Sequence, residues 1–332
     1  MIVKTFPGVY DPAALPLAAE YGPVERPQVV LAPAPLYHTN GFASVLNLVG
    51  GDTVVLMERF DAALVLDLIE RHRVSTFTAT STMLQRIAAV DGIDSRDLSS
   101  IRTVLQGAAV TAPSLVHRWL ELVGPERFLM DYGMTEGLGL SLIRGDEWLA
   151  HPGSVGRGVR DTEIRVLGPD GAEMPAGEVG EIFLRSPAGQ GYTYLGAVAD
   201  LPITADGFAT AGDLGSLDGD GFLSIADRRV DMIITGGANV YPAEVENALG
   251  DHPAVGDVVV IGLADPEWGR RVHAIVAPAD ASAPPAPADI VAFAKERLAP
   301  YKVPKTVEVV ERIPRSEATK VSRRALIDER GG

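Results

Sequence analysis

The chain contains no cysteine among its 332 residues. Disulfides, thiolate metal sites and cysteine nucleophiles are therefore excluded. It also contains no run of 18 or more apolar residues, so no membrane-spanning segment is predicted. The opening residues, MIVKTFPGVYDP, lack the apolar stretch and small-residue cleavage site of a secretory signal. Together these absences predict a cytoplasmic location.

Basic side chains are scarce as well, because 29 Lys and Arg face 44 Asp and Glu and give a formal net charge of −15. This acidity argues against nucleic-acid binding, which needs a basic surface. Lysine is especially rare, with none between Lys4 and Lys295. The acidic excess falls almost wholly before residue 232, which predicts a domain boundary near Asp231. Lys320, in the basic stretch IPRSEATKVSRRAL, is therefore a candidate for binding an anion.

Apolar residues make up 46% of the chain, enough for one or two well-filled cores. From Val29 to Gly133, strand-like apolar runs alternate with helical segments, which predicts βαβ units and a mostly parallel sheet. We expect helix caps at Asp61, at Ser81 or Thr82, and at Thr111. In such sheets, ligands bind beyond the carboxyl ends of the strands.

The remaining sequence changes character twice. Residues 161–229 alternate apolar and polar positions around GPDG and DGDG turns, which predicts a small antiparallel barrel or meander. Residues 230–332 read as a compact α+β unit. The predicted class is α/β, with a large domain represented by residues 1–160, a β-rich subdomain at 161–229, and a mobile C-terminal domain at 230–332.

Two motifs at the expected carboxyl edge carry candidate chemistry. In LQGAAV, Gly107 and its small neighbours leave room for a flat ring or a phosphate, although a tight turn would need the same residues. In DYGMTEG, Tyr132 offers an aromatic face, Thr135 a hydroxyl for a phosphate oxygen, and Glu136 a hard oxygen for Mg²⁺.

Two further motifs leave alternatives open. Asp213 in ATAGDLG suits the vicinal hydroxyls of a ribose, or an Asx turn. His38 in PLYHTNGF begins a predicted helix, where it either serves a ligand or caps the helix. No second histidine stands at metal-ligand spacing from it, so a zinc site is excluded.

In chain order these segments resemble the adenylate-forming superfamily, which includes acyl-CoA ligases, luciferases and the adenylation domains of peptide synthetases. The resemblance runs from about residue 29 to 326 and also rests on GEVGEIFLRSP, DRRVDMIITGGANVYPAEVE, VVVIGLADPEWG, YKVPKTVEVVERIPR and TKVSRRAL. Trp268, followed by glycine, and the lack of a carrier domain make the chain most similar to a stand-alone AMP-forming acyl-CoA synthetase.

The resemblance implies ATP or AMP (as the acyl-adenylate), coenzyme A and Mg²⁺ as cofactors, and a small carboxylic acid as substrate. It implies an adenosine site in which Tyr132 stacks on adenine, Asp131 meets the exocyclic amine, and Asp213 and Arg228 hold the ribose. The residues lining the same site would be Gly107, Ala108 and Gly133. Thr135 would bind the α-phosphate and Glu136 the metal.

For the thioester step, the resemblance implies a pantetheine tunnel lined by Gly236 and Gly237, with Trp268 and Tyr301 beside the CoA nucleotide. His38 would lie between the acyl pocket and that tunnel. Lys320 matches the lysine that bridges the carboxylate and the α-phosphate during adenylation. Arg323 and Arg324 are interpreted as an ordinary basic flank.

Three departures from the family pattern stand out. The Gly/Ser/Thr-rich phosphate loop with its lysine is not found in these residues, so we expect an N-terminally shortened chain limited to the thioesterification half-reaction. Val230 occupies a hinge position that is usually charged, and Thr319 replaces the glycine before the lysine. Stiff β-branched residues there would alter the domain rotation.

Several alternatives remain open from sequence. The chain could be a non-catalytic adenylate- or CoA-binding protein, or a half-enzyme completed by a partner polypeptide that makes the adenylate. The acceptor could be a carrier protein's phosphopantetheine instead of CoA. A nicotinamide-binding protein is disfavoured, because no predicted strand leads into G-x-G-x-x-G.

Overall fold

The computed structural model describes residues 2–4, 17–107, 111–187, 192–194, 201–228, 231–316 and 319–331. The chain forms two compact units, which are described separately. The first comprises Met1–Ala211 with Gly215–Ile225, and the second comprises Gly212–Leu214 with Ala226–Gly332. Among the described residues, no helix has the length and apolar character needed to cross a membrane. The predicted division at residues 160 and 229 stays a prediction.

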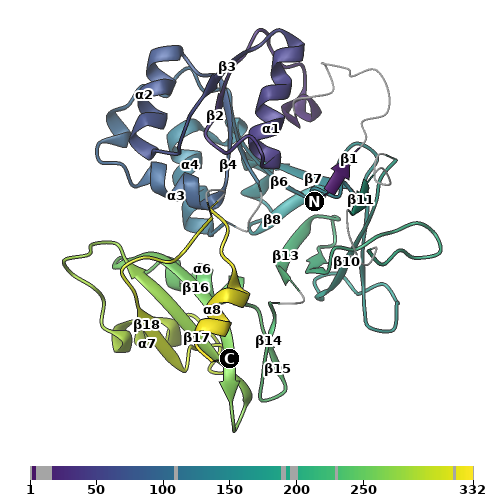
Figure 1. Cartoon of the computed structure of the whole chain (residues 1–332). Helices are drawn as coiled ribbons and strands as arrows, with labels where there is room; N and C mark the ends of the chain where they lie inside the picture. Colours follow the sequence, from purple (N-terminus) through teal and green to yellow (C-terminus); the bar gives the residue numbers. More distant parts are fainter. Residues whose placement is uncertain are drawn as a thin grey trace. The chain divides into compact units, whose positions relative to one another are not determined.

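Five parallel strands form one part of the first unit's sheet, in the order β3-β2-β4-β5-β6 (Figure 1). They are β2 (Val29–Ala32), β3 (Thr53–Leu56), β4 (Thr76–Ala79), β5 (Thr103–Gln106) and β6 (Phe128–Gly133). All four neighbouring pairs are parallel, as the alternating pattern predicted. Their carboxyl ends therefore meet at one edge of the sheet.

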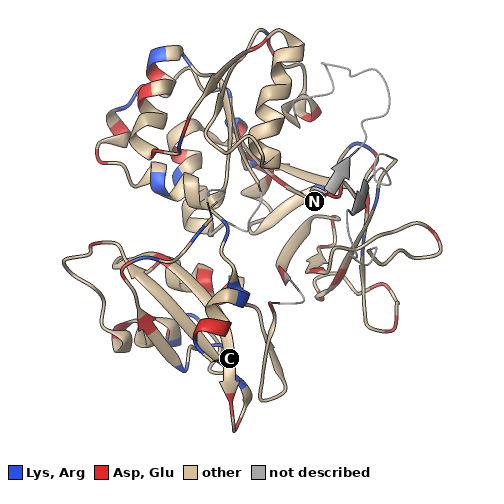
Figure 2. Ribbon diagram, viewed as in Figure 1, with Lys and Arg blue, Asp and Glu red and all other residues tan. Residues whose placement is uncertain are grey.

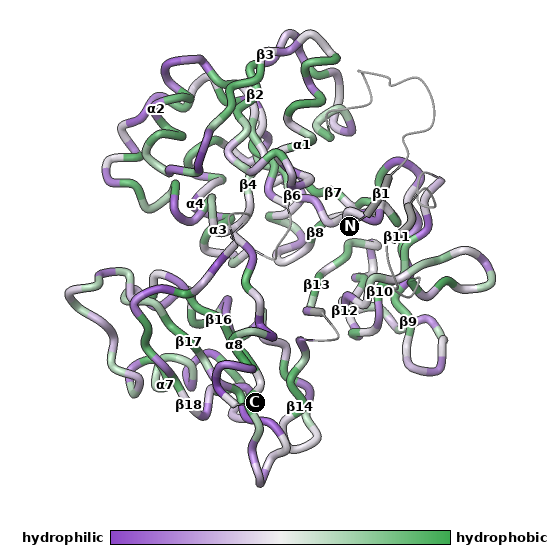
Figure 3. The backbone as a smooth tube through the Cα atoms, in the orientation of Figure 1, coloured by the Kyte–Doolittle hydropathy of each residue, from purple (hydrophilic) through white to green (hydrophobic). Residues whose placement is uncertain are grey.

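The helices of this part are α1 (Thr39–Leu46), α2 (Ala62–His72), α3 (Ser81–Ala88) and α4 (Pro113–Val123), with 3₁₀ turns at Leu17–Tyr21, Asn47–Gly50, Ile93–Ser95 and Pro125–Arg127. Of these helices, α2, α3 and α4 each bury an apolar stripe, whereas α1 buries only Gly41 and Ser44. Trp119 of α4 stacks on Phe128 and meets Phe77 edge-on, so the helix is fixed against β4 and β6. These rings are fully buried in the larger apolar core, and Figure 3 shows the apolar run of β2 and β3 in green.

The predicted caps are right for one helix and wrong for two. Asp61 caps α2 by accepting the Leu64 N–H at 2.8 Å. The cap of α3 is Thr80, one residue before the predicted Ser81 or Thr82, because its hydroxyl accepts the Met83 N–H. Helix α4 has Ala112 at the cap position, and alanine carries no side-chain acceptor, so the helix begins at Pro113 without a side-chain cap. The Thr111 hydroxyl instead bonds the hydroxyl of Ser81 at 2.6 Å.

Antiparallel strands continue the same hydrogen-bonded path beyond β6. The order is β7 (Leu140–Arg144), β8 (Ser154–Gly158), β13 (Leu223–Arg228), β12 (Asp213–Leu217), β10 (Gly180–Arg185) and β9 (Glu163–Leu167). The short helix α5 (Gly145–Trp148) follows β7, and β1 (Ile2–Lys4) pairs separately with β11 (Tyr192–Tyr194). The predicted meander of residues 161–229 thus supplies β9, β10, β12 and β13 to the antiparallel part of an 11-stranded mixed sheet.

The second unit is a small α+β sandwich. Its sheet has the order β15 (Ala238–Val240), β14 (Ile233–Thr235), β17 (Gly269–Pro278) and β16 (Val255–Asp265), with β18 (Thr306–Val309) parallel to β17. Helices α6 (Pro242–Gly250) and α7 (Pro287–Lys295) pack on one face, and α8 (Arg323–Glu329) packs on the other. Residues of β16 alternate between the two faces, Val260 toward α6 and α7 and Ile261 toward α8.

Basic and acidic residues are interspersed along the ribbons of both units (Figure 2). Most ion pairs join side chains that are at least partly exposed, so each contributes little to stability. The more buried pairs include Arg26–Asp52 in the first unit and those around Arg315 and Arg323 in the second.

Candidate functional site

The predicted site residues of the first unit lie directly after the parallel strands. His38 follows β2, Gly107 ends the path of β5, and Thr135 follows β6. Because these strands are parallel, the three positions share the carboxyl edge of the sheet. The sequence prediction of a common edge is therefore confirmed at the level of topology.

A pair of hydroxyl groups joins two of these segments. The Oγ1 atoms of Thr39 and Thr135 lie 3.2 Å apart, so the start of α1 touches the loop after β6. His38 is the N-cap of α1, with its Nδ1 3.5 Å from the Asn40 N–H. Thr39 was not predicted, although its place beside the singled-out histidine in PLYHTNGF was a usable signal.

Asp131 and Gly107 meet across neighbouring strands. The carboxylate of Asp131, on β6, lies so close to Gly107 that any side chain at position 107 would collide with it. Asp131 as a residue is partly exposed, but its carboxyl group is crowded by protein atoms, and burial raises its pKa to about 7. A glycine at position 107 thus leaves room for this carboxylate, and the binding of a flat ligand at LQGAAV stays a prediction.

The loop after β6 presents the predicted phosphate and metal groups. Gly133 and Thr135 are exposed, and Glu136 is half-buried. The loop turns at Gly137, which has φ +69° and donates its N–H to the Met134 carbonyl at 2.9 Å. Glu136 offers the hard oxygen that Mg²⁺ prefers. The Thr135 hydroxyl, which bonds the Thr39 hydroxyl, is of a type that suits a phosphate oxygen.

Tyr132 has a more structural setting than the sequence suggested. Its side chain is partly buried and packs against the apolar cluster that contains Leu138, Leu184 and Leu223. Its backbone pairs with Ser141 of β7. The ring is thereby fixed in place, and an aromatic face held in this way loses little entropy when a base stacks on it.

A chain of polar groups at the same edge escaped the sequence prediction. Gln106, which is buried, donates from Nε2 to the Ser81 hydroxyl at 3.2 Å, and that hydroxyl bonds Thr111. Gln106 belongs to the LQGAAV motif, but the motif was interpreted through its small residues alone. Such networks hold neighbouring strand ends rigid.

Two of the predicted ribose and adenine residues are not fully described. Ala108 lies outside the described residues, as does the side chain of Arg228 at the end of β13. Asp213 is buried, with 7% of its surface exposed, and begins β12 in the second unit. Its assignment to the ribose stays a prediction.

In the second unit, the predicted CoA-binding residues cluster around a hairpin. Gly236 and Gly237 form the two-residue turn of β14 and β15, with φ +55° and +82°. The Gly236 N–H donates to the Trp268 carbonyl at 2.9 Å, and a side chain on Gly236 would collide with the Trp268 ring. The Lys305 ammonium lies 4.7 Å from the centre of that ring. Gly236 is therefore needed for packing as well as for the turn.

Trp268 and Tyr301 are 40% and 46% exposed, which is unusual for such large rings. Both have a lysine nearby, since Lys302 lies 5.6 Å from the Tyr301 ring. Aromatic faces beside ammonium groups suit a nucleotide that carries phosphates. The prediction that these rings flank a nucleotide remains open.

Lys320 is exposed on a loop that is pinned at its base. The backbone of Lys320 exchanges hydrogen bonds with Ser316, at 2.9 and 3.2 Å. Arg315 donates to both Asp257 oxygens, at 2.9 and 2.7 Å, and to the Thr319 carbonyl at 2.8 Å. The interpretation of Arg323 as an ordinary flank is wrong, because its guanidinium is held by Glu246 and Asp231. Val230 lies outside the described residues.

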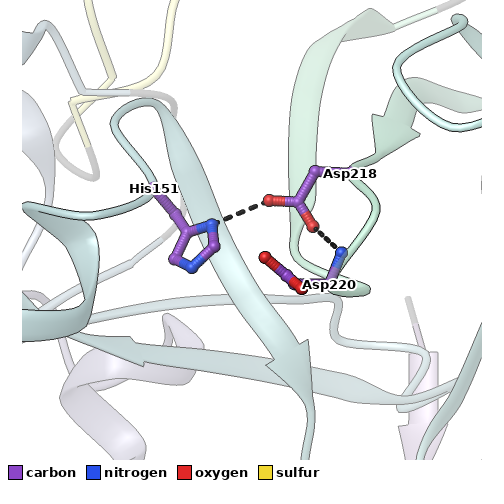
Figure 4. Close-up of side chains that lie close together, drawn as sticks. All are labelled: His151, Asp218 and Asp220. Atoms are coloured by element: carbon purple, nitrogen blue, oxygen red, sulfur yellow. Dashed lines mark hydrogen bonds and ion pairs between the residues drawn. The ribbon is translucent and has the colours of Figure 1, made fainter.

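One group of described residues has the donor types and spacing to hold a metal ion, namely His151, Asp218 and Asp220 (Figure 4). The His151 Nδ1 lies 2.8 Å from an Asp218 oxygen, and the other oxygen accepts the N–H groups of Asp220 and Phe222 at 2.9 Å each. The His151 ring also stacks on Phe222, with centroids 3.7 Å apart. These contacts give His151 and Asp218 a structural role, because together they hold the β12–β13 turn in place. Asp220 is exposed.

The parallel strands of the first unit and the α+β fold of the second unit place the chain in the α/β class of proteins. Comparison with known families makes this specific. Residues 13–194 match the family described as AMP-binding enzyme, and residues 244–320 match the AMP-binding enzyme C-terminal domain. The chain therefore belongs to the AMP-binding, adenylate-forming enzyme family.

Curated relatives and solved structures agree with this family. The chain is 39% identical over 294 residues to a feruloyl-CoA synthase of Amycolatopsis sp, and 32% identical to the indoleacetate–CoA ligase of Aromatoleum aromaticum; each match covers 88% of this chain. The o-succinylbenzoate CoA synthetase of Bacillus subtilis, solved with its acyl-adenylate intermediate, has 34% identity and a TM-score of 0.81 over 93% of this chain. An amide bond synthetase from Marinactinospora thermotolerans has 33% identity and a TM-score of 0.80 over 94%.

The chain spans only part of each of these relatives. It covers 59% of the feruloyl-CoA synthase, 57% of the indoleacetate ligase, and 62% and 64% of the two solved chains. The α/β class predicted from sequence is confirmed by the shared fold.

Proposed function

We propose that this chain is an acyl-CoA ligase that acts through an acyl-adenylate. The observation that carries the proposal is the meeting of Asp131 with Gly107, beside the linked Thr39 and Thr135, at one edge of a family-typical sheet. A carboxylate that lies against bare backbone suits the exocyclic amine of adenine. Hydroxyl groups at the adjoining strand end suit the α-phosphate.

In this proposal the adenylation groups have distinct tasks. Tyr132 stacks on adenine, Asp213 and Arg228 bind the ribose, and Thr135 binds the α-phosphate. Glu136 would hold Mg²⁺, which supplies charge neutralisation for the leaving pyrophosphate. Lys320 bridges the substrate carboxylate and the α-phosphate while a carboxylate oxygen attacks phosphorus and pyrophosphate leaves.

The second half-reaction transfers the acyl group to a thiol. The thiolate attacks the acyl carbonyl carbon, and AMP leaves with the electrons of the broken anhydride bond. Gly236 and Gly237 border the pantetheine path, and Trp268 and Tyr301 receive the CoA nucleotide. His38 lies at the acyl end of the path. A cytoplasmic location, where CoA is available, belongs to the same proposal.

For the acid, we propose an aromatic carboxylic acid. Feruloyl, indoleacetate and 2-succinylbenzoate ligases are among the relatives, and all three act on acids with an aromatic ring. A long-chain fatty acid ligase and a fatty acid–acyl-carrier-protein ligase show 32% and 33% identity, so these acids and that acceptor belong in the test.

The test is AMP release from ATP or from supplied acyl-adenylates, with a panel of ferulate, indoleacetate, 2-succinylbenzoate and palmitate. Each is offered with CoA or with a phosphopantetheinylated carrier protein. We expect acyl-CoA formation with an aromatic member. If the chain bound the acyl-adenylates tightly but formed no thioester with any member of the panel, it would instead be a binding protein.

A second candidate is a half-enzyme whose adenylate is made by a partner polypeptide. It is favoured by one sequence observation, namely that these 332 residues contain no glycine-rich phosphate loop with a lysine. A partner would then be required for activity with ATP but dispensable with a supplied acyl-adenylate.

A further inference from the structure

Arg323 is the first residue of α8 and stands three positions after Lys320. Its guanidinium reaches three separate acceptors. Nη2 donates to both Glu246 oxygens at 2.7 and 2.8 Å, Nη1 donates to Asp231 Oδ2 at 3.2 Å, and Nε donates to the Val260 carbonyl at 3.3 Å. One side chain thus joins α8 to three other segments of the second unit.

The neighbouring Arg324 shows how unusual this arrangement is. The Arg324 side chain is 86% exposed and pairs with Asp328, one turn along its own helix. The Arg323 side chain is 23% exposed, and its partners Asp231 and Glu246 are 22% and 19% exposed. Ion pairs this far from solvent are screened less than surface pairs, and leaving one partner unpaired is costly. Arg324 is therefore a matched control.

The two acidic partners do different things. Glu246, on α6, also accepts the Val260 N–H at 2.8 Å, so its link fastens α8 to α6 and β16. Asp231 directly follows Val230, the hinge position that the sequence resemblance indicates. The Asp231 link therefore ties the segment that leaves the hinge to the helix that follows Lys320.

The loop that carries Lys320 is fixed from its other side as well. Arg315 binds Asp257 of β16 and the Thr319 carbonyl, just before the lysine. With Arg323 just after it, the Lys320 backbone is held between two arginine anchors. The exposed side chain of Lys320 is then the part of the residue that these anchors leave free to move.

We propose that Arg323 is a positioning residue for Lys320, which keeps the lysine loop in fixed register with the hinge segment through Asp231. This inference rests on the proposed function, because it assigns Lys320 to the bound adenylate. A lysine stem is flexible, but a backbone displaced by about 1 Å can cost about 100-fold where a bridging contact is needed. Because the lysine loop is coupled to the hinge segment, Lys320 moves together with the second unit.

The test uses Asp231→Asn, since this change removes the hinge link and leaves the Glu246 anchor of α8 in place. The probe is 5′-O-(N-feruloylsulfamoyl)adenosine, a non-reactive acyl-adenylate mimic, with affinity measured by calorimetry. We expect Lys320→Ala to weaken binding and Asp231→Asn to weaken it about fivefold. In the Lys320→Ala background, Asp231→Asn should cost nothing further, because its effect passes through the lysine. Arg324→Gln should bind like the unchanged chain.

The outcomes separate this inference from the proposed function. If the unchanged chain does not bind the mimic, the proposed function is wrong. Suppose that the unchanged chain binds the mimic. The positioning role is then overturned if Asp231→Asn leaves the affinity unchanged, or if it weakens binding just as much in the Lys320→Ala background. The ligase proposal stands in either case. The rate of hydrogen exchange over residues 319–326 is a second readout. This rate should rise in Asp231→Asn, while the melting temperature changes little.

Discussion

The carboxyl group of Asp131 is half protonated near neutral pH, because burial raises its pKa to about 7. Both forms can accept a hydrogen bond from an amine, but the ionised form accepts a charge-assisted and therefore stronger one. We expect adenosine to bind about tenfold more tightly at pH 8 than at pH 6, as the ionised fraction rises across the pKa. Calorimetry with adenosine avoids the titration of a phosphate, and Asp131→Asn should abolish the pH dependence.

The same shift predicts how stability depends on pH. Asp131 has a folded-state pKa above its ordinary value of 3.8, so the folded state binds more protons between these values. Its favourable contribution is complete below pH 3.8 and is lost as pH rises through about 7. Relative to Asp131→Asn, the unchanged chain should therefore lose melting temperature between pH 5 and pH 8. Asp170→Asn, at an exposed turn, is the control and should show no such trend.

Thr319 adopts φ +61°, in the left-handed region that disfavours β-branched residues. A glycine there removes a strain of about 1–2 kcal/mol but adds about 0.4–1 kcal/mol of entropy in the unfolded chain. We expect Thr319→Gly to stabilise the second unit by about 0.5–1 kcal/mol in urea unfolding. Thr319→Ala keeps the strained φ, so its free energy of unfolding should be lower than that of Thr319→Gly. The reverse order would show that the threonine side chain outweighs its backbone strain.

At the scale of elements, the β14–β15 hairpin sets the position of Trp268. A methyl group on Gly236 would collide with the Trp268 ring, whereas one on Gly237 would meet open space. Both residues have positive φ, so each alanine variant carries similar backbone strain, and only Gly236→Ala displaces the ring. We expect Gly236→Ala to weaken CoA binding several-fold more than Gly237→Ala does.

Tryptophan fluorescence can follow this binding. Of the three tryptophans, Trp119 and Trp148 are fully buried and Trp268 is 40% exposed, so acrylamide quenching should report chiefly on Trp268. Bound CoA should protect it from the quencher in the unchanged chain and in Gly237→Ala. If bound CoA protected Trp268 equally well in Gly236→Ala, the hairpin would not be part of the CoA site.

At the scale of the whole molecule, the polypeptide of these 332 residues should favour the second half-reaction. Holding the β- and γ-phosphates needs several oriented donors, and losing one such donor costs about 10²–10³ in rate. Thioester formation from a supplied adenylate does not involve those phosphates. We therefore expect this polypeptide to convert feruloyl-adenylate and CoA to feruloyl-CoA and AMP, with little pyrophosphate release from ferulate and ATP.

The measurement pairs AMP release from the supplied adenylate with pyrophosphate release from ATP. Lys320→Ala serves as the control, since it should affect the ATP reaction and the adenylate's affinity more than the thioester step. Rapid pyrophosphate release by the unchanged polypeptide would show that other groups in these residues hold the terminal phosphates.

The sequence alone determined the features that depend on local chemistry. Alternating strand and helix periods predicted the parallel strands β2 to β6, and Asp61 identified the start of α2, because both signals lie within a few residues of the element concerned. Motif order identified the family for the same reason. Closely spaced residues such as Tyr132, Thr135 and Glu136 could be proposed as one site from their place at the end of a strand.

Only the tertiary structure decided what joins distant segments. Thr39 meets Thr135 across 96 positions, and Arg323 meets Asp231 across 92, and no spacing in the sequence predicts either contact. Likewise the hydroxyl of Thr111 bonds Ser81 of a neighbouring segment instead of capping its own helix. Such partners are chosen by how strands and helices pack together, so a polar side chain that seems to belong to local structure is recruited by a neighbour that folding brings within reach.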